Sequence, residues 1–175
     1  MMDQGVLDKI KSLSKVHLFI EPYLPAVSWD EILEFINIHK SERVGYKILP
    51  NDNAFFYNRA ERIKSVNEVV REVYNRFELN HTDKNTLTCQ LFGSAIVEGD
   101  TALEKHHDSE DNLFWQLKGR SRWRTFDDYE TDKPTIDIIV EEGDMLFIPS
   151  NTIHFVDSEG PRAAVAILFD RNKKK

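Results

Sequence analysis

The second half of this chain is a close succession of short segments of the kind that form β-strands. Six of them lie between residues 86 and 169, rich in β-branched and aromatic residues and separated by Gly, Asp and Pro: TLTCQLFG, LFWQLKG, RWRTF, PTIDIIV, DMLFIP and RAAVAILF. No helical pattern alternates with them, as the βαβ units of a parallel sheet would require. The sequence therefore predicts a mainly β domain, built as a sandwich or jelly roll.

Helices are predicted before this region. A capping box, Ser followed three residues later by Glu, precedes apolar residues at helical spacing in the ranges 28–39 and 65–77, and a weaker helical pattern covers residues 6–13. We expect these short helices to pack on the sheet through their apolar faces. Residues 1–175 are then one domain, with a helical part over about 1–80 and a jelly-roll core over about 85–170.

Charge and composition limit the partners that the protein can have. The chain carries 23 Lys and Arg against 30 Asp and Glu, a net charge of −7, so nothing attracts it generally to nucleic acid or to an anionic membrane. A small-molecule or peptide substrate is expected instead. One cysteine, no leader-like apolar segment and no apolar run of about 20 residues predict a cytoplasmic protein that does not enter a membrane. The sequence leaves the oligomeric state open, a homodimer included.

Basic side chains alternate along one of the predicted strands. They are Lys118, Arg120, Arg122 and Arg124. Such a stripe is compatible with nucleic-acid binding. On a strand of an acidic protein, however, we expect these cations to form a solvated, salt-bridged surface.

A histidine and an aspartate two residues apart precede the second predicted strand. Side chains at positions i and i+2 of a strand point to the same face, so His106 and Asp108 are expected to form a chelating pair. His154, at the end of the strand–turn–strand pattern GDMLFIPSNTIHF, is expected to supply a third ligand. Two imidazoles and a carboxylate make a facial triad, which leaves three positions of an octahedral ferrous ion open. The plainer alternatives are a surface histidine hydrogen-bonded to a carboxylate and a buried structural histidine.

The same residues carry a resemblance to a known family. Residues 106–119 are similar to the first cupin motif, with Asp108 in place of its second histidine and Asn112 in place of its glutamate, and residues 143–154 look like the second motif. Together they imply a double-stranded β-helix, the cupin jelly roll. Over about residues 86–169 the chain resembles the cupin-like JmjC oxygenases, which include the asparaginyl hydroxylase that acts on hypoxia-inducible factor, the ribosomal oxygenases and the tRNA wybutosine hydroxylase.

The resemblance implies a role for each of these positions. His106, Asp108 and His154 would hold Fe(II), and Asn112 would line the site of the co-substrate, 2-oxoglutarate. One position departs from the family pattern. In the pattern G-x-K-x-W the family carries a Lys or Arg that pairs with the distal carboxylate of 2-oxoglutarate, and this chain has Ser121 there.

Arg162 is the cation that we expect to take over this role. It lies eight residues after His154, and the wider class of 2-oxoglutarate oxygenases often places its carboxylate-binding arginine on the strand after the distal histidine. A guanidinium suits bidentate recognition of a carboxylate. The alternative is an exposed arginine just after a turn at Gly160 and Pro161.

The function expected from the resemblance is hydroxylation of a small molecule, a peptide or a protein side chain by an Fe(II)- and 2-oxoglutarate-dependent oxygenase. Ser121 keeps a second possibility open, a cupin that binds metal without using 2-oxoglutarate, either as another small-molecule enzyme or as a noncatalytic binding module. A third is a jelly roll without metal that serves as a binding scaffold.

Overall fold

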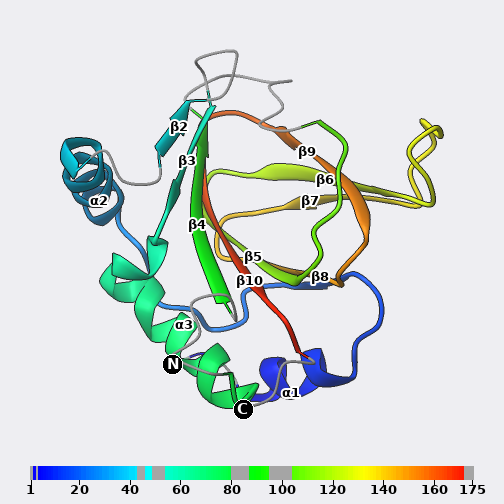
Figure 1. The fold of residues 1–175 in the computed structure, drawn as a ribbon, viewed down its shortest axis with the longest axis horizontal. Helices are drawn as coiled ribbons and strands as arrows, with labels where there is room; N and C mark the ends of the chain where they lie inside the picture. The colour runs from blue at the N-terminus through cyan, green and yellow to red at the C-terminus, as the bar shows by residue number, and fades with distance from the viewer. Residues whose placement is uncertain are drawn as a thin grey trace.

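Two sheets face each other in the computed structural model of this chain, which describes residues 2, 4–42, 46–48, 54–79, 87–94 and 104–171 (Figure 1). Within these residues one sheet has seven strands in the order β1-β8-β5-β10-β4-β3-β2, and the other has three in the order β7-β6-β9. The strands are β1 (His17–Phe19), β2 (Tyr46–Ile48), β3 (Ala54–Asn58), β4 (Leu87–Ser94), β5 (Asp111–Lys118), β6 (Ser121–Phe126), β7 (Ile136–Val140), β8 (Met145–Ile148), β9 (Ile153–Ser158) and β10 (Arg162–Phe169). All neighbouring strands are antiparallel. The predicted jelly roll, a double-stranded β-helix, is confirmed.

In the described part of the chain, three α-helices lie on the side of the seven-stranded sheet that faces away from the three-stranded sheet (Figure 1). They are α1 (Gln4–Ser12), α2 (Trp29–Glu42) and α3 (Lys64–Arg76), and a short 3-10 helix, η1 (Ala60–Arg62), precedes α3. No helix in the described part of the chain is long and apolar enough to cross a membrane.

The capping boxes predicted for two of these helices had different outcomes. Before α2 the box forms, because the backbone N–H of Glu31 donates to Ser28 Oγ at 3.2 Å and the N–H of Ser28 donates to Glu31 Oε2 at 2.9 Å. The second prediction was wrong. Helix α3 begins at Lys64, and Ser65 lies inside its first turn, where the Ser65 hydroxyl donates to Glu31 Oε1 at 2.8 Å. A tertiary contact between α2 and α3 has therefore replaced the local cap.

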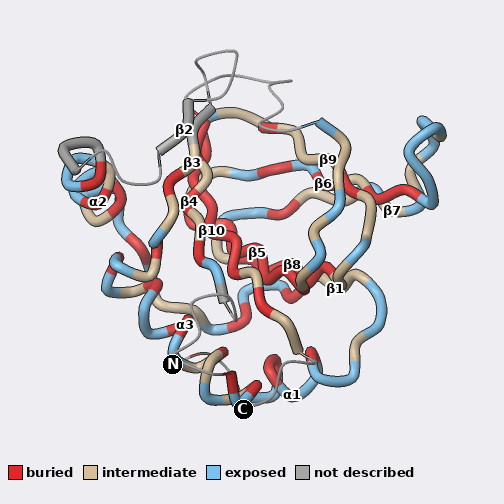
Figure 2. Tube along the Cα trace, in the orientation of Figure 1, coloured by how far each residue is buried: buried red, intermediate tan, exposed pale blue. Residues whose placement is uncertain are grey.

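The buried apolar residues form two clusters, one on each face of the seven-stranded sheet (Figure 2). Because side chains alternate along a strand, Trp115 and Leu117 of β5 join the large cluster under the helices. Phe114 joins a small cluster between the two sheets, with Trp123, Val140, Leu146, Ile148 and Ala164. The helices thus complete the main core on one face, and the space between the sheets is left to hold a site.

Candidate metal centre

His106 and His154 come together through backbone hydrogen bonds between distant parts of the chain. His154 is the second residue of β9, and His106 forms an isolated bridge with it: each N–H donates to the other residue's carbonyl, at 3.0 and 2.8 Å. The expectation that His106 and Asp108 lie on a regular strand was wrong. Backbone pairing with β9 stops at His106, and residues 107–110 lead to the start of β5 without forming a strand.

Asp108 is held instead by a turn from another part of the chain. The N–H of Asn151, in the turn between β8 and β9, donates to the Asp108 carbonyl at 2.7 Å. In the same turn the N–H of Ser150 donates to Asp111 Oδ1 at 3.0 Å. The turn that precedes His154 therefore also fixes the segment that carries Asp108.

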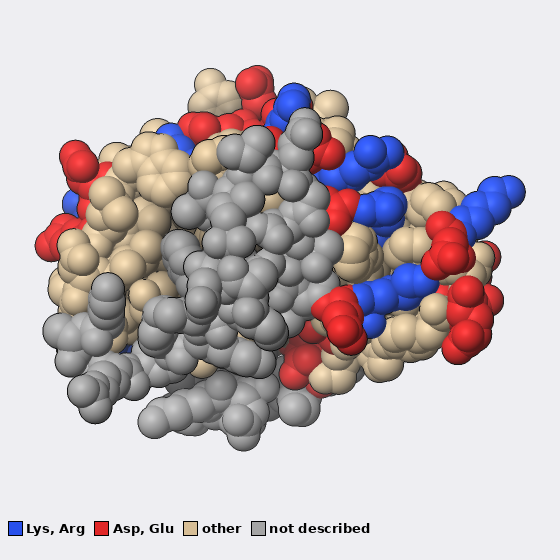
Figure 3. Space-filling view, turned by 90° about the horizontal axis from the view of Figure 1, so that it is seen from above, with Lys and Arg blue, Asp and Glu red and all other residues tan. Residues whose placement is uncertain are grey.

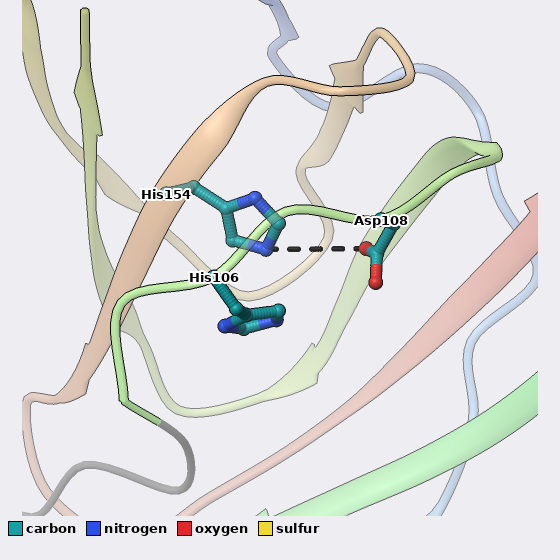
Figure 4. Close-up of side chains that lie close together, drawn as sticks. All are labelled: His106, Asp108 and His154. Carbon is teal, nitrogen blue, oxygen red and sulfur yellow. Dashed lines mark ion pairs between the residues drawn. The ribbon is translucent and has the colours of Figure 1, made fainter. Parts of the chain in front are cut away.

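The three side chains converge on one point (Figure 4). One ligand atom from each of His106, Asp108 and His154 lies within 4.8 Å of the others, and His154 Nε2 is 3.9 Å from Asp108 Oδ2. Atoms bound to a common ion at about 2.1 Å lie roughly 3 to 4 Å apart. A small closure of these side chains is enough to coordinate one ion.

Hydrogen bonds leave the Nε2 atom of each imidazole free to bind metal. Nδ1 of His106 lies 2.7 Å from the carbonyl of Glu104, and Nδ1 of His154 lies 2.9 Å from that of Thr152. A carbonyl only accepts, so Nδ1 carries the proton and Nε2 keeps its lone pair. Burial lowers the pKa of His154, which favours the neutral form that a metal ligand must have. The donor set of this site fits a ferrous ion.

A cavity of about 130 Å³ lies between the sheets beside the three ligands. Its wall includes Asn112, Trp123 and Arg162, with apolar surface from Phe114 and Ala166. A cavity of about 150 Å³ is known to hold a benzene ring. The space is therefore of the size of a small organic acid.

Arg162, the first residue of β10, is buried in this wall and is only 3% exposed. Its Nε donates to Ser158 Oγ at 2.9 Å, and its Nη1 has no hydrogen-bond partner among the residues that the structure describes. No carboxylate of the described residues lies within ion-pair distance, and burial lowers the pKa of Arg162 to about 10. A buried guanidinium without a counter-ion is unfavourable, so this position is suited to binding an anion.

Glycine at position 119 allows the backbone of Arg162 to come this close. Gly119 has a φ of +65°, and a Cβ atom there would lie 2.2 Å from the Pro161 carbonyl oxygen and 3.3 Å from Arg162 Cα. Any side chain would push the β9–β10 turn away from the β5–β6 turn. Gly119 is thus one reason why Arg162 starts its strand at this end of the cavity.

The other two predicted co-substrate residues lie in different surroundings. Asn112 is in the cavity wall, where its Nδ2 donates to Asp108 Oδ2 at 3.4 Å and its buried Oδ1 has no partner. Ser121 is fully buried outside the cavity lining, and its hydroxyl donates to Gln116 Oε1 at 2.8 Å. The structure brings Asn112 to the metal ligands and does not bring Ser121 there.

Sequence reasoning missed Ser158, the partner of Arg162. A signal for it was present, because residues 154, 156 and 158 of one strand share a face. Once His154 is assigned to the interior, Ser158 must face the interior too, near the arginine that begins the next strand.

Comparison with known proteins identifies the family of this fold and site. The family model of the JmjC domain matches residues 72–175, more than half of the chain. The chain belongs to the JmjC domain family. No curated protein matches the sequence.

Solved structures resemble this JmjC domain over almost its whole length. The ribosomal oxygenase YcfD from Escherichia coli, in complex with cobalt and 2-oxoglutarate, matches with a TM-score of 0.71 and 15% identity over 97% of this chain and 52% of that chain. Its complex with cobalt and succinic acid gives a TM-score of 0.70 with the same identity and the same coverage of both chains. At this identity the likeness shows the fold, and the JmjC chain spans about half the length of YcfD.

Proposed function

We propose that this protein is an Fe(II)- and 2-oxoglutarate-dependent oxygenase that hydroxylates its substrate. The observation that carries the proposal is the pairing, in one cavity, of a two-histidine, one-carboxylate site with a buried arginine that has no counter-ion among the described residues. With dioxygen and 2-oxoglutarate, a ferrous ion there supplies the oxidation of a C–H bond to an alcohol, and succinate and carbon dioxide are the other products.

His106, Asp108 and His154 would hold the metal on one side, which leaves the opposite positions for the co-substrate and dioxygen. The hydrogen bonds at each Nδ1 fix the tautomer, so the imidazoles need no change of tautomer to bind. Asn112 donates to Asp108 and so orients its carboxylate.

Arg162 would bind the distal carboxylate of 2-oxoglutarate. Its free Nη1 can donate to a carboxylate oxygen, and the low polarity around it strengthens such a charge-assisted bond. Phe114 and Ala166 border the same space and help to exclude water from the reacting groups.

The proposed substrate is a peptide, a protein side chain or a small molecule, acted on in the cytoplasm. A protein substrate is supported by the likeness to YcfD, which is a ribosomal oxygenase. We further propose that residues 1–175 act as one domain, because the helices bury the outer face of the seven-stranded sheet, whose inner face borders the cavity.

Anaerobic titration with Fe(II) and 2-oxoglutarate tests the proposal. We expect a weak visible charge-transfer band that needs both components, and succinate after air is admitted. His154→Ala should lose the band and the bound iron while it keeps the wild-type circular dichroism. A folded wild-type protein that binds iron but forms neither band nor succinate would overturn the assignment.

A second candidate is a metal-binding cupin that does not use 2-oxoglutarate. The observation in its favour is Ser121, an uncharged residue where the family normally places the cation. In that case the protein would bind iron but not 2-oxoglutarate. Addition of 2-oxoglutarate would then leave the affinity of the bound metal for oxalate unchanged.

A further inference from the structure

The indole N–H of Trp123 is a buried hydrogen-bond donor without an acceptor. Trp123 is the third residue of β6, is 2% exposed and lines the cavity, and its Nε1 has no partner within the described ranges of the chain. Buried tryptophan N–H groups usually find an acceptor. An unmatched donor in the wall of a cavity points to an acceptor on the molecule that fills it.

The pairing of β6 with β9 places Trp123 between the arginine and the metal ligands. Across these two strands Ser121 lies opposite Ser158, Trp123 opposite Val156, and Thr125 opposite His154. Successive pairs on one face are about 7 Å apart, since a strand rises about 3.4 Å per residue. The first pair supports Arg162 through Ser158, and the last contains a metal ligand.

Ring contacts fix the direction of the indole. It stacks on the imidazole of His154 with 5.1 Å between centroids, and it meets the ring of Phe114 edge-on at 4.7 Å. These contacts need only an aromatic face, which phenylalanine would also provide. The N–H group is what tryptophan adds at this position.

We propose that Trp123 donates a hydrogen bond from Nε1 to a carboxylate oxygen of the acid that spans the metal and Arg162. This inference rests on the proposed function and extends it to a second donor for the co-substrate. Ser121 cannot be that donor where it lies, because its hydroxyl already bonds to Gln116.

Indole resonances give a direct test. The chain has three tryptophans, so a proton–nitrogen NMR spectrum of the zinc-loaded protein contains three indole signals. On addition of 2-oxoglutarate the Trp123 proton should move downfield and exchange more slowly with water, whereas the signal of Trp29, which is 45% exposed, should stay in place. Triple-resonance assignment identifies the signals without any variant. A stationary Trp123 signal in protein saturated with 2-oxoglutarate would overturn the inference.

Affinity measurements on Trp123→Phe give a second test and locate the acceptor. Calorimetry with zinc-loaded protein should show about 10-fold weaker binding of 2-oxoglutarate, as expected for one hydrogen bond to a charged group, with unchanged metal content. Oxalate reproduces only the metal-binding end of 2-oxoglutarate. If the variant binds oxalate more weakly by the same factor, the acceptor is the carboxylate at the metal. If oxalate is unaffected, the acceptor is the distal carboxylate.

Two negative results remain distinguishable. Equal affinity of wild type and Trp123→Phe for 2-oxoglutarate would overturn the role of Trp123 and leave the proposed function intact. Wild-type protein that binds zinc but no 2-oxoglutarate would overturn both.

Discussion

Arginines on the outer and inner faces of the jelly roll have different partners. On the outer face of β6, Arg122 donates to both carboxylate oxygens of Asp137 at 2.7 Å, and Arg124 pairs with Asp157. Arg162 of β10 faces the cavity, and within the part of the chain that the structure describes its guanidinium bonds to Ser158 and to no carboxylate. Figure 3 shows the mixed character of the exterior, where basic and acidic side chains lie next to one another on the coloured part of that face.

This difference distinguishes surface cations that form ion pairs within the protein from a buried cation that is available to bind a ligand. Each of the four alternating cations noted in the sequence has a nearby carboxylate, as a salt-bridged surface requires: Lys118 with Glu142 at 2.6 Å, Arg120 with Glu141 and Glu159 at 4.0 Å, Arg122 with Asp137 and Arg124 with Asp157. Exposed pairs of this kind contribute little to stability. A buried cation left unpaired is costly, so its presence indicates a function outside folding.

The largest effect is expected from removing the inner arginine. Arg162→Leu should raise the apparent Kd for 2-oxoglutarate about 100-fold, because charge-assisted hydrogen bonds in a dry site are lost. The melting temperature should stay the same or rise, since a buried unpaired charge disappears. Calorimetry and thermal melts measure the two effects.

The matched control is the same change on the outer face. Arg122→Leu should leave the affinity for 2-oxoglutarate unchanged, because its guanidinium bonds to Asp137 outside the cavity. If both variants lose affinity equally, or neither does, the distinction between the two faces is wrong.

An intermediate effect is expected from Gly119→Ala, which moves the inner arginine without removing it. The added Cβ would meet the Pro161 carbonyl at 2.2 Å, so the variant should be destabilised by about 2 kcal/mol. Its affinity for 2-oxoglutarate should fall about 10-fold through displacement of Arg162. Urea unfolding and calorimetry provide the measurements.

Gly143→Ala is the control for backbone strain alone. Gly143 also has a positive φ, +92°, but a Cβ there would have nothing within 4 Å. It should lose about 1 kcal/mol of stability and none of the co-substrate affinity. Equal loss of affinity in both variants would argue against the close approach at Gly119 as the cause.

The smallest effect is expected for the ion pair of Arg122 and Asp137 on the outer face, whose contribution to stability depends on pH. The hydrogen bond from Arg122 lowers the pKa of Asp137 below its ordinary value of 3.8. The contribution of the pair to stability is therefore complete above that value and is lost as the pH falls through the lowered pKa of the folded state. Arg122→Leu should lower the melting temperature at pH 7 by no more than about 2 °C. The difference should vanish in strong acid and shrink in high salt; a difference that persists in both would contradict an ion-pair origin.

Much of the fold could be predicted because its signals are local. Each of the six predicted segments forms a strand, and the capping box at Ser28 forms as expected. The failures have non-local causes. Ser65 bonds to Glu31, which lies 34 positions away, and in place of the expected strand His106 forms an isolated bridge with His154.

The sequence by itself determined which ligand types are available, how far apart they lie along the chain, and that a jelly roll would hold them. The resemblance predicted Arg162 as the cation of the site, and the alternating pattern predicted Arg122 on a salt-bridged surface. Tertiary structure alone decided that Arg162 is buried beside a serine and meets no carboxylate of the described residues. Its surroundings follow from how β6 and β9 pair, with Ser121 opposite Ser158, and from the contact of Gly119 with Pro161. Strand register depends on packing between segments distant in the sequence, so only the folded chain shows a buried guanidinium that bonds to a serine and to no carboxylate of the described residues.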